Sequence, residues 1–168
     1  RERRQIAADT QAAFDAKQAK DFVDRLIRDT EQCNAAPRFP DDCLDLTNRL
    51  ARILTEAYQL HKEAEPLYRQ ALAATTAAYG DADPQTASSE LALALNLFDQ
   101  NKLAEAEPHF RKGLDIRIKA FGDKNRATVN AYYVLAKALT RQARYREADP
   151  LYRKLIDLRE AVQGAKDP

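Results

Sequence analysis

The sequence stretch EAEPLYRQAL, which begins at Glu63, returns as EAEPHFRKGL from Glu105 and as EADPLYRKLI from Glu147. Each copy begins 42 residues after the one before it. The same period separates three of the four glycines in the chain, Gly80, Gly122 and Gly164. A fixed period of this size indicates a stack of similar units, none of which can bury its apolar face alone. We therefore expect an elongated solenoid whose function lies on its surface.

The composition is typical of a helical protein and gives no reason to expect a nucleic-acid or membrane partner. The chain has 168 residues, of which 45% are apolar and 32% are charged. Its 27 basic and 26 acidic side chains nearly balance, so charge gives no reason to expect nucleic acid or anionic lipid as a partner. No apolar run approaches the roughly 20 residues of a membrane span. We expect neither nucleic-acid binding nor membrane insertion.

The period divides the chain into an N-terminal segment, residues 1–44, and three tandem repeats within residues 45–168. The repeats are expected at about 45–86, 87–128 and 129–168. Residues 1–44 do not match the repeat, and the helical spacing of their apolar residues predicts a helix that either caps the stack or forms an interaction arm. With two helices in each repeat, the chain is predicted to be all-α, with about seven or eight helices.

Each predicted repeat carries small and large apolar residues at fixed places. In the second helix an alanine precedes an aromatic by four residues, as in Ala64 and Tyr68, Ala106 and Phe110, and Ala148 and Tyr152. The alanine allows close approach of the paired helix, and the aromatic fills the space between repeats. The first helix carries a Leu-Ala pair followed three residues later by Leu. Its earliest copy, Leu50-Ala51 with Leu54, lies one residue further from the next repeat motif than the others do, which predicts a one-residue insertion in that turn.

The residues with special backbone needs predict where the second helices begin and end. Pro66, Pro108 and Pro150 are expected in the first turn, where amide groups have no intrahelical acceptor. Gly80 and Gly122 are expected to end the helices with positive φ.

The pattern Leu-Ala-x-x-Leu followed by Ala-x-x-x-Tyr/Phe resembles the tetratricopeptide repeat. The 42-residue period and the Gly-x-x-Asp-Pro junction resemble the longer form found in kinesin light chains. This resemblance, which covers about residues 50–168, implies a right-handed superhelix that serves as a non-catalytic scaffold for proteins or peptides. The sequence departs from kinesin light chains where those usually carry Asn-Asn: Leu91-Ala92 and Tyr133-Val134 stand there. Known ligands of those proteins therefore do not carry over.

On tetratricopeptide geometry, the concave wall comes mainly from the first helix of each repeat. The residues expected there are Leu91, Ala92, Leu95, Phe98, Asn130, Tyr133, Val134, Lys137 and Arg141. They would form an apolar floor with a cationic edge, which suits a partner segment with one or two apolar anchors and an acidic group. The alternative is that Leu95 and Phe98 pack against neighbouring helices.

Two cysteines, Cys33 and Cys43, flank a loop with two prolines. A disulfide between them would close a loop of about 11 residues and stabilise the fold by roughly 3 kcal/mol in the chain-entropy model. It would indicate a periplasmic or secreted protein. The alternative is a pair of reduced thiols in a cytoplasmic protein.

No residue pattern predicts catalysis, a cofactor or a metal. The chain has two histidines, His61 and His109, and both replace packing residues of other repeats without a further ligand at metal-binding spacing. A Gly-rich phosphate loop and a nucleophile elbow are absent from the sequence. We expect a protein that is not an enzyme.

A second hypothesis is a structural, regulatory or self-associating segment of a larger protein. The chain opens at Arg1 without an initiator Met, and its last residues repeat the Gly-x-x-Asp-Pro junction, so we expect a piece of a longer protein. An unfinished further repeat would leave an apolar stripe on the last helix and favour self-association through that end. The stripe is expected to contain Leu151, Leu155, Ile156, Leu158 and Val162.

Overall fold

The computed structural model describes residues 40–56 and 58–164, together with Asp21, Asp24, Arg25 and Arg28. These residues contain six complete α-helices and no strand. The helices are α2 (Pro40–Glu56), α3 (His61–Tyr79), α4 (Pro84–Asp99), α5 (Leu103–Phe121), α6 (Arg126–Arg141) and α7 (Tyr145–Gly164). None of them is long and apolar enough to cross a membrane.

Helix α2 begins at Pro40, within the segment assigned to the N-terminal cap. The rest of that segment, including Cys33, lies outside the described residues, and Cys43 is described only as part of α2. The capping role and the disulfide therefore stay predictions.

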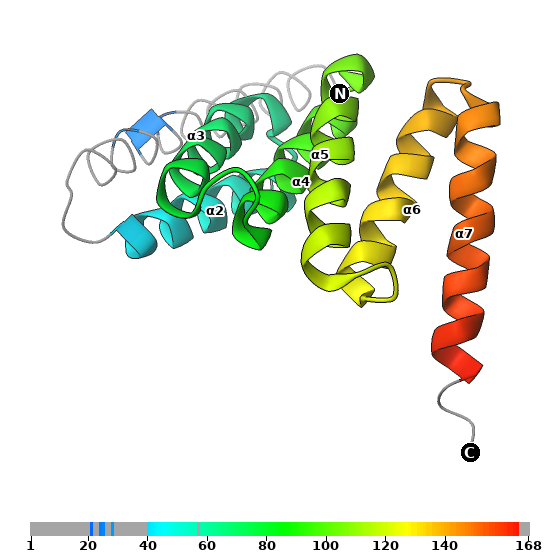
Figure 1. Cartoon of the computed structure of the whole chain (residues 1–168). Helices are drawn as coiled ribbons and strands as arrows, with labels where there is room; N and C mark the ends of the chain where they lie inside the picture. The colour runs from blue at the N-terminus through cyan, green and yellow to red at the C-terminus, as the bar shows by residue number, and fades with distance from the viewer. Residues whose placement is uncertain (1–20, 22–23, 26–27, 29–39, 57, 165–168) are drawn as a thin grey trace, which may run out of the picture.

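The six helices form three antiparallel pairs, α2–α3, α4–α5 and α6–α7, stacked in one row (Figure 1). Each helix packs on its neighbours in the chain, and the first helices α4 and α6 also touch each other. The helix directions rotate along the row, from α2 and α3 at one end to α6 and α7 at the other (Figure 1). The all-α repeat architecture is thus confirmed, with slightly fewer helices in the described residues than the predicted seven or eight.

Side-chain caps start the first helices, and glycines end the second ones. Asp83 and Asn125 are N-caps whose side chains accept hydrogen bonds from the backbone N–H groups of Gln85 (2.7 Å) and Ala127 (2.8 Å). Gly80 and Gly122 have φ values of +87° and +75°. Because residues with a Cβ rarely adopt these angles, the predicted role of both glycines is confirmed.

The turn within each pair has the same backbone shape in all three repeats. One residue with a side chain takes positive φ in each turn: Gln59, Asn101 and Ala143. The backbone N–H of the next residue donates a hydrogen bond to the carbonyl of a buried leucine in the first helix. These bonds join Leu60 to Leu54, Lys102 to Leu97 and Arg144 to Leu139. The first of these spans one residue more than the other two, which confirms the predicted insertion.

The paired helices cross at alanines that are almost completely buried. Ala106 of α5 is 0% exposed, as are Ala94 of α4 and Ala64 of α3. Phe110, one turn beyond Ala106, is also 0% exposed and belongs to a core that continues from pair to pair. The small residue permits the close helix approach. The Phe110 ring meets the Phe98 ring of its own pair, and the predicted filling of the space between repeats stays a prediction.

The second helices begin earlier than their prolines suggest. Helix α3 begins at His61, so Pro66 lies inside the helix and not in its first turn. Proline removes one helical hydrogen bond there. In the first turn, the His61 carbonyl accepts hydrogen bonds from the side-chain amides of Asn96 (3.0 Å) and Gln100 (3.2 Å) of the next repeat. The beginning of α3 is therefore tied to the following pair.

A carboxylate on α3 and its counterpart on α5 each bind cations from their own repeat and from the next. Glu65 of α3 binds Arg69 (2.8 Å) in the same helix and Lys102 (2.6 Å) in the following turn. Gln100 donates a hydrogen bond of 2.9 Å to the same carboxylate, and Arg69 also reaches Glu105 at 3.3 Å. This cluster holds the first and second pairs in register.

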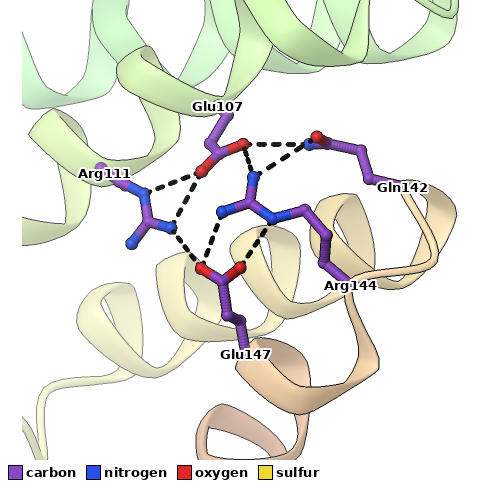
Figure 2. A network of polar contacts seen from close by, with 5 residues as sticks. All are labelled: Glu107, Arg111, Gln142, Arg144 and Glu147. Atoms are coloured by element: carbon purple, nitrogen blue, oxygen red, sulfur yellow. Dashed lines mark hydrogen bonds and ion pairs between the residues drawn. The ribbon is translucent and has the colours of Figure 1, made fainter.

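The cluster returns one period later between the second and third pairs. Figure 2 shows Glu107 of α5 bound to Arg111, Gln142 and Arg144, with Glu147 closing the cluster. Arg111 lies 2.9 Å from Glu107 and 3.3 Å from Glu147. The central carboxylates Glu65 and Glu107 are each 14% exposed, whereas the cations of both clusters and the outer carboxylates Glu105 and Glu147 are at least 35% exposed. The two junctions therefore use the same charge arrangement.

Replacing Ala106 with leucine should destabilise the protein, because the crossing of α4 and α5 has no room for a larger side chain. The expected loss is about 1–3 kcal/mol of unfolding free energy. Ala104→Leu, on an exposed face of the same helix, is the matched control and should change the free energy by less than about 0.5 kcal/mol. Equal denaturant midpoints for the two variants would contradict the close crossing.

The carboxylate clusters should make the stack sensitive to acid. Burial raises the pKa of Glu65, but hydrogen bonds from Lys102, Arg69 and Gln100 outweigh it and lower the pKa from 4.5 to about 2. Burial likewise raises the pKa of Glu107, but hydrogen bonds from Arg111, Gln142 and Arg144 outweigh it, so this pKa is also lowered. Because the folded pKa values lie below the unfolded ones, this stabilisation is present above about pH 4.5 and is lost as the pH falls towards about 2.

The double variant Glu65→Gln, Glu107→Gln should therefore melt below the parent near neutral pH, yet lose less stability on acidification. Thermal melting followed by circular dichroism between about pH 6 and about pH 3 measures both effects. Asp157→Asn, at an exposed carboxylate outside the clusters, should keep the parent's pH profile. Parallel profiles for the double variant and the parent would show that these carboxylates do not couple to folding.

Candidate functional site

The first helices α2 and α4 enclose an open groove of about 750 Å³. Its apolar floor includes Ala92 and Leu95, and Leu95 is 41% exposed. Polar groups that line it include Asn48, Arg52, Thr55, Glu56, Tyr68, Ser88 and Asp99. We call this hollow the α2–α4 groove. Its mixture of an apolar floor and polar walls is typical of protein and peptide binding sites.

A tyrosine hydroxyl forms a polar point in the α2–α4 groove. The hydroxyls of Tyr68 and Thr55 lie 3.3 Å apart, and Thr55 donates to the Ala51 carbonyl at 2.6 Å. Burial raises the pKa of Tyr68, and the carboxylates of Glu56 and Asp99 add to this effect while Thr55 and Arg52 oppose it. Tyr68 therefore keeps its proton at neutral pH. Because Thr55 donates its own proton to Ala51, the Tyr68 hydroxyl donates to Thr55 and can accept a hydrogen bond from a ligand.

Two of the residues predicted for the groove are covered by the protein itself. Leu91 is 5% exposed and packs against α5, where Gly113 leaves room for it: a Cβ added to this glycine would lie 2.6 Å from the Leu91 side chain. Phe98 is 4% exposed and meets the Phe110 ring edge to face, with 6.3 Å between the ring centroids. The alternative of packing against neighbouring helices is therefore correct for Phe98 and wrong for Leu95.

The predicted residues of α6 do not line the α2–α4 groove. Asn130 and Tyr133 line a separate hollow beside Arg117 and Arg126, near the end of α5. Val134 is partly buried against the core, whereas Tyr133 is 43% exposed. The nine predicted residues thus do not form one site: three are buried or partly buried, two line the α2–α4 groove, two line the second hollow, and Lys137 and Arg141 lie over the Phe98 ring.

Of the two cations predicted for the groove edge, Arg141 is engaged in contacts within the protein. The Arg141 guanidinium lies 4.4 Å from the centre of the Phe98 ring and donates hydrogen bonds to the Phe98 carbonyl (3.1 Å) and Asn101 (2.9 Å). Arg141 therefore holds the turn after α4. Lys137 lies over the same ring at 5.2 Å but makes no ion pair with any described residue. Of the two predicted cations, Lys137 is the one available to a partner.

Sequence reasoning missed Arg52 and Asp99, although the repeat register could have found them. Allowing for the insertion in the first turn, Arg52 corresponds to Leu95 and Lys137, while Asp99 corresponds to Arg141. Within the part of the chain that the structure describes, neither Arg52 nor Asp99 forms an ion pair.

A buried charge lies on the other side of α4. Glu90, with a side chain 3% exposed, binds His109 at 2.5 Å and Lys112 at 2.8 Å. Burial raises the pKa of Glu90, but these two partners outweigh it and keep the carboxylate charged. His109 is thus the partner of a buried carboxylate and not the simple packing residue that we expected. Across the described ranges, no group of three or more His, Cys, Asp or Glu could hold a metal ion.

The comparisons with known proteins agree with this architecture. The family model of the tetratricopeptide repeat matches residues 42–119 and 89–161. The chain belongs to the tetratricopeptide repeat family. Proteins of this fold are typically non-catalytic and bind other proteins. A search of curated proteins finds no match.

Two solved structures from Podosopora anserina, of a protein assigned as a kinesin light chain with nearly identical TPR-like repeats, are similar to this chain. One has a TM-score of 0.70 and 20% identity over 88% of this chain and 70% of its own. The other, a substituted form, has a TM-score of 0.71 and 20% identity over 88% and 69%. BtubC (BKLC) from P. vanneervenii has a TM-score of 0.63 and 16% identity over 86% and 57%. Such identities show the fold alone.

The different roles of the two α6 cations can be measured. Arg141→Ala should lower the free energy of unfolding by about 1–2 kcal/mol, because it removes two hydrogen bonds and a cation over the Phe98 ring. Lys137→Ala is the matched control and should change that free energy by less than about 0.5 kcal/mol. Denaturant unfolding of both variants measures the difference. An unchanged denaturation midpoint for Arg141→Ala would contradict the structural role of this residue and favour the predicted role in partner binding.

Proposed function

We propose that this chain is a non-catalytic scaffold that binds a segment of a partner protein in the α2–α4 groove. The observation that carries the proposal is the combination of an exposed apolar residue, Leu95, with charged groups that have no ion-pair partner among the described residues, Arg52 and Asp99. Elsewhere in the stack, the carboxylates of the junctions are satisfied within the protein. A surface with unused polar groups beside apolar area suits recognition.

The partner segment proposed here has one or two apolar anchors and an acidic group. Leu95 and Ala92 offer the apolar contact, and Tyr68 offers a hydroxyl for a backbone group of the segment. Arg52 lines the groove, and Lys137 of α6 lies beyond its lining, over the Phe98 ring. Both correspond to Leu95 in the repeat register, and they are the cations proposed to bind the acidic group of a segment that extends from the groove towards α6. The apolar anchors would supply most of the affinity, and the charge would set the register of the segment.

A second candidate function is association through the C-terminal end of the stack. Ile156 of α7 is 57% exposed, which favours this idea. However, Leu155 and Leu158 of the predicted stripe are 4% and 8% exposed, because they pack within the α6–α7 pair. Val162 lies among residues whose side chains are outside the description. The exposed apolar stripe is therefore smaller than expected, and self-association has less support than groove binding.

Charge reversal tests the groove. The double variant Arg52→Glu, Lys137→Glu should lose at least about tenfold in affinity for peptides selected from a random library of about 12-residue segments. The selected peptides should themselves contain an apolar residue near Asp or Glu. Titration of labelled peptides, followed by fluorescence anisotropy, gives the affinities, and circular dichroism checks the fold.

The matched control is Lys124→Glu, Arg146→Glu, which reverses two exposed cations outside the groove. It carries the same change in net charge and should keep the parent affinity. Equal loss in both double variants would show a general charge effect. Retained binding in Arg52→Glu, Lys137→Glu would exclude the groove as the binding site.

A further inference from the structure

One exposed side of α7 carries the counterparts of the charged residues with which α3 and α5 contact the next helical pair. Asp149 and Arg153 of α7 stand one period after Glu107 and Arg111, and two periods after Glu65 and Arg69. They bind each other at 2.8 Å, with side chains 58% and 77% exposed. In the first two copies, a Gln and a cation of the following turn bind the carboxylate, and a Glu of that turn binds the arginine. Among the described residues, no such turn contacts Asp149 and Arg153.

The apolar part of the same surface is also uncovered. Ile156 corresponds to Leu72 and Leu114, which pack against the core, and Leu114 is only 7% exposed. Ile156 itself is 57% exposed. Tyr152 is partly buried, whereas its counterpart Phe110 is 0% exposed. This side of α7 therefore carries both the charged and the apolar residues that form the contacts between the first and second pairs and between the second and third pairs. We call these two contacts the inner junctions.

We propose that this surface, formed by Asp149, Tyr152, Arg153 and Ile156, is a docking site for another helical pair of the repeat type. The pair is recognised by its turn, which carries Gln-x-Lys/Arg-x-x-Glu. The Gln and the cation bind Asp149, as Gln100 and Lys102 bind Glu65. The Glu binds Arg153, as Glu105 binds Arg69. The first helix of the incoming pair covers Ile156 with an apolar face. This docking is independent of the α2–α4 groove.

The turn signature distinguishes this occupant from a second copy of the chain stacking head to tail. A second copy would present its first turn, in which positive φ marks Gln59 as the counterpart of Asn101 and Ala143. The flanking residues are then Tyr58 and Leu60, where the inner junctions have a Gln and a cation. Of the three recognition groups, this turn keeps only Glu63. A copy added end to end would leave Asp149 without its cation.

An extended chain tests the surface directly. Pro168 stands 42 residues after Arg126, so a copy of residues 127–164 joined to Pro168 continues the repeat in register and brings the Gln142, Arg144 and Glu147 turn. Docking should raise the melting temperature by roughly 5 °C over the parent chain. Asp149→Ala and Ile156→Asp should each remove at least half of that rise while changing the unextended chain little. Asp157→Ala, at another exposed carboxylate of α7, should leave the rise intact.

Two further arms make the test specific. An extension copied from residues 42–79, whose turn has Tyr58 and Leu60, should give less than half of the rise. Asp149→Arg should abolish docking of the first extension, and Arg144→Asp within the appended copy should restore it. Equal rises for both extensions, or no rise for either, would overturn the proposal. So would sedimentation of the unextended chain as a dimer that Ile156→Asp dissolves, because a second copy would then cover the surface.

Discussion

The close crossing of two helices at buried alanines is the contact on which the rest of this structure depends. Ala64, Ala106 and Ala148 are at most 2% exposed, and each brings the second helix of a pair against the first. Because a single pair cannot bury both of its apolar sides, it needs the next pair, and the core grows as a row instead of a centre. Every surface of the protein is consequently set by how one pair meets the next.

The charged clusters at the junctions add register to this packing. Ion pairs with partly buried carboxylates contribute little net stability when compared with apolar contacts, because desolvation of the charges offsets their attraction. Their geometry nevertheless admits few partners. The carboxylate binds an amide and a cation from one turn of the next pair, and the arginine binds a carboxylate from the same turn. These contacts form together only when the next pair lies in one position. The junction thus resembles a recognition site within one chain (Figure 2).

The same contacts decide which parts of the surface remain available. Arg141 uses its donors on the turn after α4, and Phe98 is covered as a result. In the α2–α4 groove, Arg52 and Asp99 have no ion-pair partner among the described residues. The molecule therefore has two kinds of surface: a mixed apolar and polar groove along the first helices, and an end face on α7 that matches the inner junctions.

The sequence by itself determined the number and register of the helical pairs, the glycines with positive φ, the one-residue insertion and the alanine crossings. These features depend on backbone needs and on spacing within one repeat, which a 42-residue period makes visible. Only the tertiary structure decided that Leu91 and Phe98 are buried, that Arg141 binds a turn, and that His109 contacts Glu90. These outcomes depend on side-chain reach between helices, and a rotation of each pair by a fraction of a turn changes which groups meet. Local spacing does not contain that rotation, so the fold could be predicted more fully than the site.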